Sequence, residues 1–147
     1  MKRERKKYLV FVYGTLKRGY GNNVLLKNSK FIGRGFTKQK YYMQMEGCSF
    51  PYALPSDYFK DIPEHYKGYI LGEVYEVDER TLERLDMLEG HPNFYQREIT
   101  TIILEDGAEV QAFIYHYYDF YGEENLIEPD EYGFIEWSKE KLLEVIA

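Results

Sequence analysis

The order of strands and helices constrains the fold of this chain more than any other feature of its sequence. Apolar and aromatic runs predict strands, and capped amphipathic stretches predict helices. The first half of the chain is expected to form a strand at 8–13, a short helix at 22–28 capped by Asn22 or Asn23, and strands at 30–36, 39–45 and 50–55. A long strand at 66–77 and a helix at 79–89 follow. The second half then continues with a hairpin at 97–118, which has a two-residue type I′ turn at Asp106-Gly107, and a last helix from Ser138. This order lacks the regular strand–helix alternation of a doubly wound sheet. It predicts an α+β fold, in which a small mixed sheet curls into a partly closed β-barrel with short helices at its rim.

Length, charge and cysteine content narrow the class of protein. The 147 residues predict a single domain over 8–147, preceded by a flexible basic tail at 1–7. The net charge of −6 argues against nucleic-acid binding, which needs a positive patch to neutralise phosphates. No apolar stretch approaches the length of a membrane span, and the run at 8–13 is too short for a secretion signal. The single Cys48 excludes an internal disulfide, so we expect a cytoplasmic protein that binds neither nucleic acid nor membrane.

The helix at 79–89 carries an acidic residue in an unusual place. Asp78 is positioned to cap its first turn, Gly90 to end it in the left-handed conformation, and Pro92 lies just beyond. At about 100° per residue, one face of the helix carries an apolar stripe of leucines: Leu82, Leu85 and Leu88. Glu89 follows Leu82 by seven residues and falls about 20° from it in projection. If the helix persists to Glu89, this side chain points toward the core.

A carboxyl group at this position is expected to hold a proton more tightly than usual, for two reasons. Burial disfavours the ionised form, and the C-terminus of a helix presents partial negative charge. Both effects raise the pKa toward neutrality, where one group can accept a proton and later return it. Glu89 is therefore the first candidate for a general acid/base, and Asp86, less centrally placed on the same face, is the second. The alternative is that the helix frays at Leu88 and Glu89 turns into solvent.

The loop after the first strand reads VYGTLKRGYG. Gly14 and Gly19 have the spacing of a phosphate-binding loop, but Tyr20 stands where that loop needs a lysine, so nucleotide binding is not expected. A glycine at position 14 lets the backbone turn sharply and expose its N–H groups. Such groups can hold a carboxylate or a developing oxyanion. The alternative is a plain strand exit, for which glycine is also common.

Other catalytic patterns are missing from the sequence. His65, His91 and His116 are scattered without the spacing of metal ligands, so no metal site is expected. The G-x-S-x-G pattern of a Ser-His-Asp hydrolase does not occur. The chemistry must therefore come from other groups.

Four segments in combination resemble the γ-glutamylcyclotransferase-like family, with the γ-glutamylamine cyclotransferases as the nearest branch. They are VFVYGTLKRG near the start, GEVYEVDERTLERLDMLEG in the middle, YQR at 95–97, and the strand AFIYHY after the hairpin. The resemblance covers about residues 8–118. It implies a small mixed α/β structure around a partly closed β-barrel with a cavity, and a reaction that needs no cofactor and no metal.

The resemblance also implies an activity and a site. The family's reaction converts a γ-glutamyl amide into 5-oxoproline and a free amine, as the α-amine of this small-molecule substrate attacks its own γ-carbonyl. The implied catalytic residue is Glu89. The implied substrate-binding residues are Tyr13, Gly14, Thr15, Leu16, Tyr95 and Tyr117. The chain departs from compact relatives at 56–67 and 117–134, which are expected to shape the pocket mouth.

Two other functions stay open on the sequence alone. A binding module would hold a small amino-acid-like metabolite in the same cavity without converting it. A protein-interaction role would use the aromatic and acidic stretch at 117–134. The sequence does not determine which γ-glutamyl compound is the substrate, or the oligomeric state.

Overall fold

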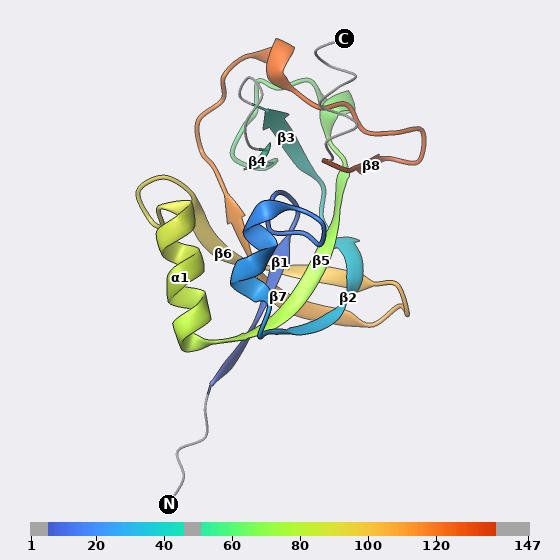
Figure 1. Ribbon diagram of the computed structural model, residues 1–147. Coiled ribbons are helices and arrows are strands. Elements are labelled where there is room, and N and C mark those ends of the chain that lie inside the picture. Colours follow the sequence, from blue (N-terminus) through green and yellow to red (C-terminus); the bar gives the residue numbers. More distant parts are fainter. Residues whose placement is uncertain (1–5, 46–50, 138–147) are drawn as a thin grey trace, which may run out of the picture.

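Five strands form a barrel at the centre of the protein. The structure, a computed structural model, describes residues 6–45 and 51–137. The strands pair in the order β1–β5–β2–β6–β7, and β7 returns to β1. Their bounds are β1 Lys7–Val12, β2 Lys30–Thr37, β5 Tyr69–Asp78, β6 Gln96–Leu104 and β7 Glu109–His116. Neighbouring strands of the barrel are antiparallel, except where β1 meets β7 (Figure 1). There the two strands are parallel, and the pairing of Val10 with Phe113 closes the barrel. The predicted α+β barrel is confirmed, and the ring is closed.

Smaller elements extend the wall of the barrel. The β3 and β4 strands form an antiparallel pair, and β4 joins β7 through Ala53, which lies opposite His116. The short β8 strand runs parallel to β5. The bounds are β3 Tyr41–Met45, β4 Pro51–Pro55 and β8 Phe134–Ile135, with 3₁₀ helices η1 at Gly21–Leu26, η2 at Glu64–Tyr66 and η3 at Glu123–Asn125. In Figure 1, β3 and β4 lie at one end of the barrel, while η1 and the α-helix pack together beside it.

The α-helix α1, at Glu79–Glu89, begins and ends where the sequence predicts. The Asp78 carboxylate accepts a hydrogen bond from the Thr81 N–H (2.8 Å), and Gly90 ends the helix with φ 68°. Leu82 and Leu85 are buried, which contributes about 2 kcal/mol each to folding. The prediction for the third leucine is wrong, because Leu88 is 44% exposed. The helix does not fray before Glu89, since Glu89 is its last residue.

Two local predictions are wrong. The hairpin turn is longer than two residues, because Gly107 N–H bonds the Leu104 carbonyl (2.9 Å) and Leu104 N–H bonds that of Ala108 (2.8 Å). A type I′ turn needs a positive φ at Asp106, whereas the described non-glycine residues all have negative φ and Gly107 alone in this turn is left-handed. The asparagines at 22 and 23 do not cap η1, whose N-cap is Tyr20 without a side-chain bond. Their amides bond the preceding loop instead.

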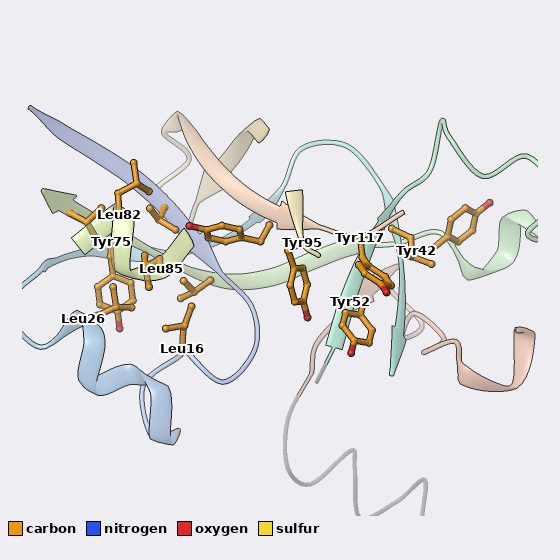
Figure 2. Packing of buried hydrophobic residues seen from close by; sticks show 14 of the residues in the cluster. Leu16, Leu26, Tyr42, Tyr52, Tyr75, Leu82, Leu85, Tyr95 and Tyr117 are labelled. Carbon is orange, nitrogen blue, oxygen red and sulfur yellow. The ribbon is translucent and has the colours of Figure 1, made fainter. Parts of the chain in front are cut away.

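One of the two clusters of the core has a leucine-rich part and a tyrosine-rich part. Figure 2 shows Leu16, Leu26, Leu82 and Leu85 gathered with Tyr75 near α1 and η1. Tyr52, Tyr117 and Tyr42 lie further along, toward β3 and β4, and Tyr95 lies between the two groups (Figure 2).

Some expectations fall outside these observations. The predicted helix from Ser138 and the lone Cys48 lie outside the described residues. The described part of the chain contains no helix that is both long and apolar enough to cross a membrane. The first strand begins at Lys7, one residue before the predicted start.

Candidate active site

A small pocket lies where the end of β1, the end of α1 and β7 meet. Residues 11–16 form one side of it, and Pro51, Glu89, Tyr95 and Tyr115 complete the lining. Its cavity volume is about 40 Å³. Glu89 and the loop at 13–16 thus face one cavity, although they lie more than seventy residues apart in the sequence.

The loop at 13–16 is held by bonds from the residues that follow it. Lys17 N–H donates to the Gly14 carbonyl (3.0 Å) and closes a tight turn. The Asn22 amide donates to Thr15 Oγ1 (2.8 Å), and the Asn23 amide donates to the Leu16 carbonyl (2.8 Å). The asparagines therefore fix the shape of the loop.

Gly14 is required by a close approach across the pocket. A Cβ atom at this position would lie 2.9 Å from Cγ of Pro51. Side-chain carbons do not come this close, so Pro51 would have to move. The glycine allows the loop and the start of β4 to stand against each other.

The Tyr13 hydroxyl is fully engaged in joining three strands. It donates to the Tyr115 carbonyl (2.5 Å) on β7 and accepts from the Ala53 N–H (3.1 Å) on β4. Burial raises the pKa of this phenol well above its ordinary value of 10. Tyr13 lines the pocket through its ring, while its hydroxyl supports the end of β1.

The Glu89 carboxyl differs from the other acid of this turn in its surroundings. Its residue is partly buried, and burial raises the pKa of its carboxyl from the ordinary value of 4.5 to about 7. Among the described residues, no hydrogen bond or ion pair engages this carboxyl. Its backbone carbonyl accepts the N–H of Tyr95 (3.1 Å), which ties the following loop to the end of the helix. Such a group can exchange a proton near neutral pH.

Asp86, the second candidate, has both carboxylate oxygens occupied. Its Oδ1 accepts from the Tyr115 hydroxyl (2.7 Å), and its Oδ2 lies 3.0 Å from Nη1 of Arg97. Asp86 does not line the pocket, whereas Tyr115 does. The arrangement suits a supporting carboxylate better than a proton carrier.

The two tyrosines expected near the pocket have different positions. Tyr95 lines the pocket, and its hydroxyl donates to the Pro51 carbonyl (2.9 Å). Tyr117 does not line it: its ring stacks on Tyr52 with centroids 4.8 Å apart, and its hydroxyl pairs with that of Tyr121 (2.5 Å). The ring centroids of Tyr117 and Tyr95 are 5.9 Å apart, so Tyr117 lies behind the residue that lines the pocket.

Sequence reasoning missed several residues of the site. Pro51 and Tyr115 line the pocket, and Arg97 pairs with Asp86. Asp86 and Tyr115 are separated by 29 residues and meet only through the packing of α1 on the barrel. No local pattern in the sequence signals such a contact. The described residues contain no group of three His, Cys, Asp or Glu side chains suited to a metal ion.

Comparisons with known proteins agree on a family. Residues 10–138 match the family model described as "Gamma-glutamyl cyclotransferase, AIG2-like". A relative from Methanocaldococcus jannaschii, provisionally named as a gamma-glutamylcyclotransferase, is 48% identical over 109 residues, which cover 74% of this chain and 82% of the relative. The human gamma-glutamylaminecyclotransferase is 39% identical over 127 residues, covering 73% of this chain and 76% of the human protein.

Solved structures give the same result. The crystal structure of a mouse AIG2-like protein has a TM-score of 0.67 at 31% identity, and the match covers 92% of each chain. An uncharacterised protein of Pyrococcus horikoshii has a TM-score of 0.62 at 25% identity, covering 93% of this chain and 95% of the other. This chain belongs to the AIG2-like γ-glutamyl cyclotransferase family.

Proposed function

We propose that this protein converts a γ-glutamyl amide into 5-oxoproline and a free amine, with Glu89 as the general acid/base. One observation carries the proposal. Glu89, with the pKa of its carboxyl raised to about 7, lines the same pocket as Gly14, Thr15 and Leu16. The reaction needs a group that takes and returns a proton, beside a fixed set of donors for the carbonyl oxygen.

The proton balance explains why one carboxyl suffices. The substrate's α-ammonium group first releases a proton to solvent. The resulting amine attacks the γ-carbonyl carbon, and the Glu89 carboxylate takes a second proton as the new N–C bond forms. The glutamic acid then delivers that proton to the leaving nitrogen as the amide C–N bond breaks. A pKa of about 7 suits both directions of transfer at neutral pH.

The loop at 13–16 supplies the second requirement, stabilisation of the developing oxyanion. The backbone N–H groups of Thr15 and Leu16 make no hydrogen bond within the described part of the chain, so they are available as donors. We infer that they receive the γ-carbonyl oxygen as it gains negative charge. The Asn22 and Asn23 bonds hold these donors in place before the substrate arrives.

The size of the cavity bears on the substrate. A volume of about 40 Å³ holds a few water-sized groups, so it suits the reacting atoms of a substrate better than a whole γ-glutamyl amide. We infer that the reacting centre enters beside Glu89 while the amine portion remains near the mouth. Relatives at 39% identity that are named gamma-glutamylaminecyclotransferase support a γ-glutamyl amine as the substrate class. We also propose that the reaction takes place in the cytoplasm.

A substrate panel tests the proposal. Purified protein is incubated with γ-glutamyl amines, among them ε-(γ-glutamyl)lysine, and with γ-glutamyl amino acids, and 5-oxoproline is measured by mass spectrometry. The Glu89→Gln variant serves as the control, because its amide is nearly isosteric but accepts no proton. We expect 5-oxoproline from the wild-type protein with at least one compound and a loss of product in the variant.

The opposite results are equally clear. Full activity of the Glu89→Gln variant on a confirmed substrate would show that another group carries the proton. If no compound gives 5-oxoproline while one of them binds equally to both proteins, the cavity is a binding module without turnover.

A further inference from the structure

We propose that the Asp86–Arg97 ion pair is a positioning unit for Glu89. It holds the pocket-lining Tyr115 and keeps the charge beside Glu89 balanced, and so sets the pH range in which Glu89 exchanges protons. The inference rests on the proposed role of Glu89, but its physical content can be measured without turnover.

The geometry joins three elements around the end of α1. Asp86 on α1 accepts from the Tyr115 hydroxyl on β7 (2.7 Å) and pairs with Arg97 on β6 (3.0 Å). The Arg97 guanidinium also lies over the Phe113 ring, 4.6 Å from its centroid. The ion pair is largely shielded, since each side chain is 21% exposed. The contacts fix Tyr115, and with it the pocket wall opposite the loop at 13–16.

The same unit reaches the loop that follows Glu89. Arg97 N–H donates to Nδ1 of His91 (3.0 Å), and His91 N–H donates to the Asp86 carbonyl (2.9 Å). These two bonds close the chain from α1 to β6 into a ring. Glu89 lies inside that ring in sequence, and the Asp86–Arg97 ion pair joins the same two ends of the segment a second time, through their side chains.

The charges near Glu89 are few. The phenols that line the pocket with it, those of Tyr13, Tyr95 and Tyr115, remain neutral because burial raises the pKa of each one. Among the residues described, the other charged groups acting on the pocket-lining Tyr115 are Asp86 and Arg97. Asp86 precedes Glu89 by three residues, about one turn of the helix, and the charges of Asp86, Arg97 and Glu89 all act on the Tyr115 phenol.

Each single substitution leaves one uncompensated charge of known sign. Arg97→Gln leaves the Asp86 carboxylate alone, and a nearby negative charge raises the pKa of Glu89. Asp86→Asn leaves the Arg97 guanidinium alone, and a nearby positive charge lowers that pKa. The double variant carries neither charge and returns to the wild-type value. A purely structural unit would not produce opposite displacements.

The test is a pH titration of the Glu89 side-chain carboxyl by ¹³C NMR, in the full-length wild-type protein and the three variants. We expect the midpoint to move up by about 0.5 in Arg97→Gln and down by about 0.5 in Asp86→Asn, because partial exposure weakens each charge. The reading comes from the Glu89 carboxyl carbon itself. Once a substrate is found, the pH dependence of kcat should follow the same order.

Two controls separate charge from general damage. Arg97→Lys keeps the positive charge and is expected to keep the wild-type midpoint, even if the stacking on Phe113 is weakened. Lys38→Gln and Glu109→Gln break an exposed ion pair (2.7 Å) that is not part of the pocket, and neither should move the midpoint. If Asp86→Asn does not fold, the comparison of Arg97→Gln with Arg97→Lys still decides the matter.

Some outcomes would overturn the inference. Midpoints that stay unchanged in both single variants, or that move in the same direction, would show that the pair does not control Glu89. An equal displacement in Arg97→Lys and Arg97→Gln would assign the effect to packing. Absence of 5-oxoproline formation by the wild-type protein would instead count against the proposed function, and the titration would stand independently.

Discussion

Two acidic residues in the last turn of α1, Asp86 and Glu89, occupy opposite surroundings. Asp86 faces the strands of the barrel, where Tyr115 and Arg97 take up both of its oxygens. Glu89 faces the pocket, where its carboxyl meets aromatic rings and the glycine loop but no partner among the described residues. Burial without a partner raises the pKa of Glu89 to about 7.

The difference shows that local sequence alone does not reveal which of two neighbouring acids finds hydrogen-bond and ion-pair partners. Both acids lie on the same helix within one turn, and both were candidates from periodicity. What distinguishes them is the element opposite each side chain. Asp86 has both carboxylate oxygens occupied by a cation and a phenol, whereas burial of the Glu89 carboxyl raises its pKa into the range where it can exchange a proton near neutral pH.

The largest expected effect is the loss of activity when Glu89 is replaced. Glu89→Gln should reduce kcat for 5-oxoproline formation about 10²- to 10⁴-fold, since proton transfer by a positioned side chain contributes on this order. KM should change little, because the amide fills the same space. Glu83→Gln, an exposed acid on the same helix, is the matched control and should keep wild-type kcat. A similar loss in both variants would remove the special role of Glu89.

A second effect concerns stability and pH. Between pH 4.5 and 7, folded Glu89 holds a proton that the unfolded chain has released, so its contribution to the free energy of unfolding falls as pH rises. The rise in pKa corresponds to at most about 3 kcal/mol. Glu89→Gln should therefore become more stable relative to wild type as pH increases through this window, as measured by urea denaturation. A difference that is constant with pH would contradict the raised pKa.

A third, smaller effect tests Asp86. Asp86→Asn removes a shielded ion pair but can still accept from Tyr115, so we expect a loss of about 2 kcal/mol in the free energy of unfolding at pH 7. Glu109→Gln breaks an exposed pair and should cost well under about 1 kcal/mol. Urea denaturation of both variants provides the measurement. Equal losses would mean that the shielding of the Asp86–Arg97 pair has no consequence.

The smallest expected effect tests the hydrogen bond from the Tyr115 hydroxyl to Asp86. Tyr115→Phe removes the hydrogen bond to Asp86 and leaves the ion pair with Arg97, so a loss of about 1 kcal/mol is expected. Thermal unfolding at neutral pH measures it. A loss as large as that of Asp86→Asn would show that the phenol, and not the guanidinium, is the main partner of Asp86.

The features that depend on neighbouring residues were predictable from the sequence. The Asp78 cap and the Gly90 stop determine α1, and apolar patterns located the barrel strands within a few residues. Glu89 could be predicted to point toward the core because the helical repeat, counted over two turns from Leu82, determines the direction of its side chain. The same reasoning applied to Leu88 was wrong, since exposure depends on what packs against the helix.

The features that depend on distant contacts were not predictable. Asn22 and Asn23 lie within η1 and bond the 13–16 loop instead of capping the helix, because the loop folds back onto η1. Asp106 uses its side chain to accept the Ala108 N–H (2.9 Å), so the hairpin turn differs from the two-residue form. The Arg97 pairing with Asp86 arises only when β6 passes the end of α1.

The most direct test of the central claim is the titration of the Glu89 carboxyl in the wild-type protein. Site-specific ¹³C NMR follows this one carbon as pH is raised from about 3 to 9. The structure predicts a midpoint of about 7, as expected for a buried acid without a partner. A midpoint near the ordinary value of 4.5 would mean that the carboxyl is well solvated, and the case for Glu89 as proton carrier would fail.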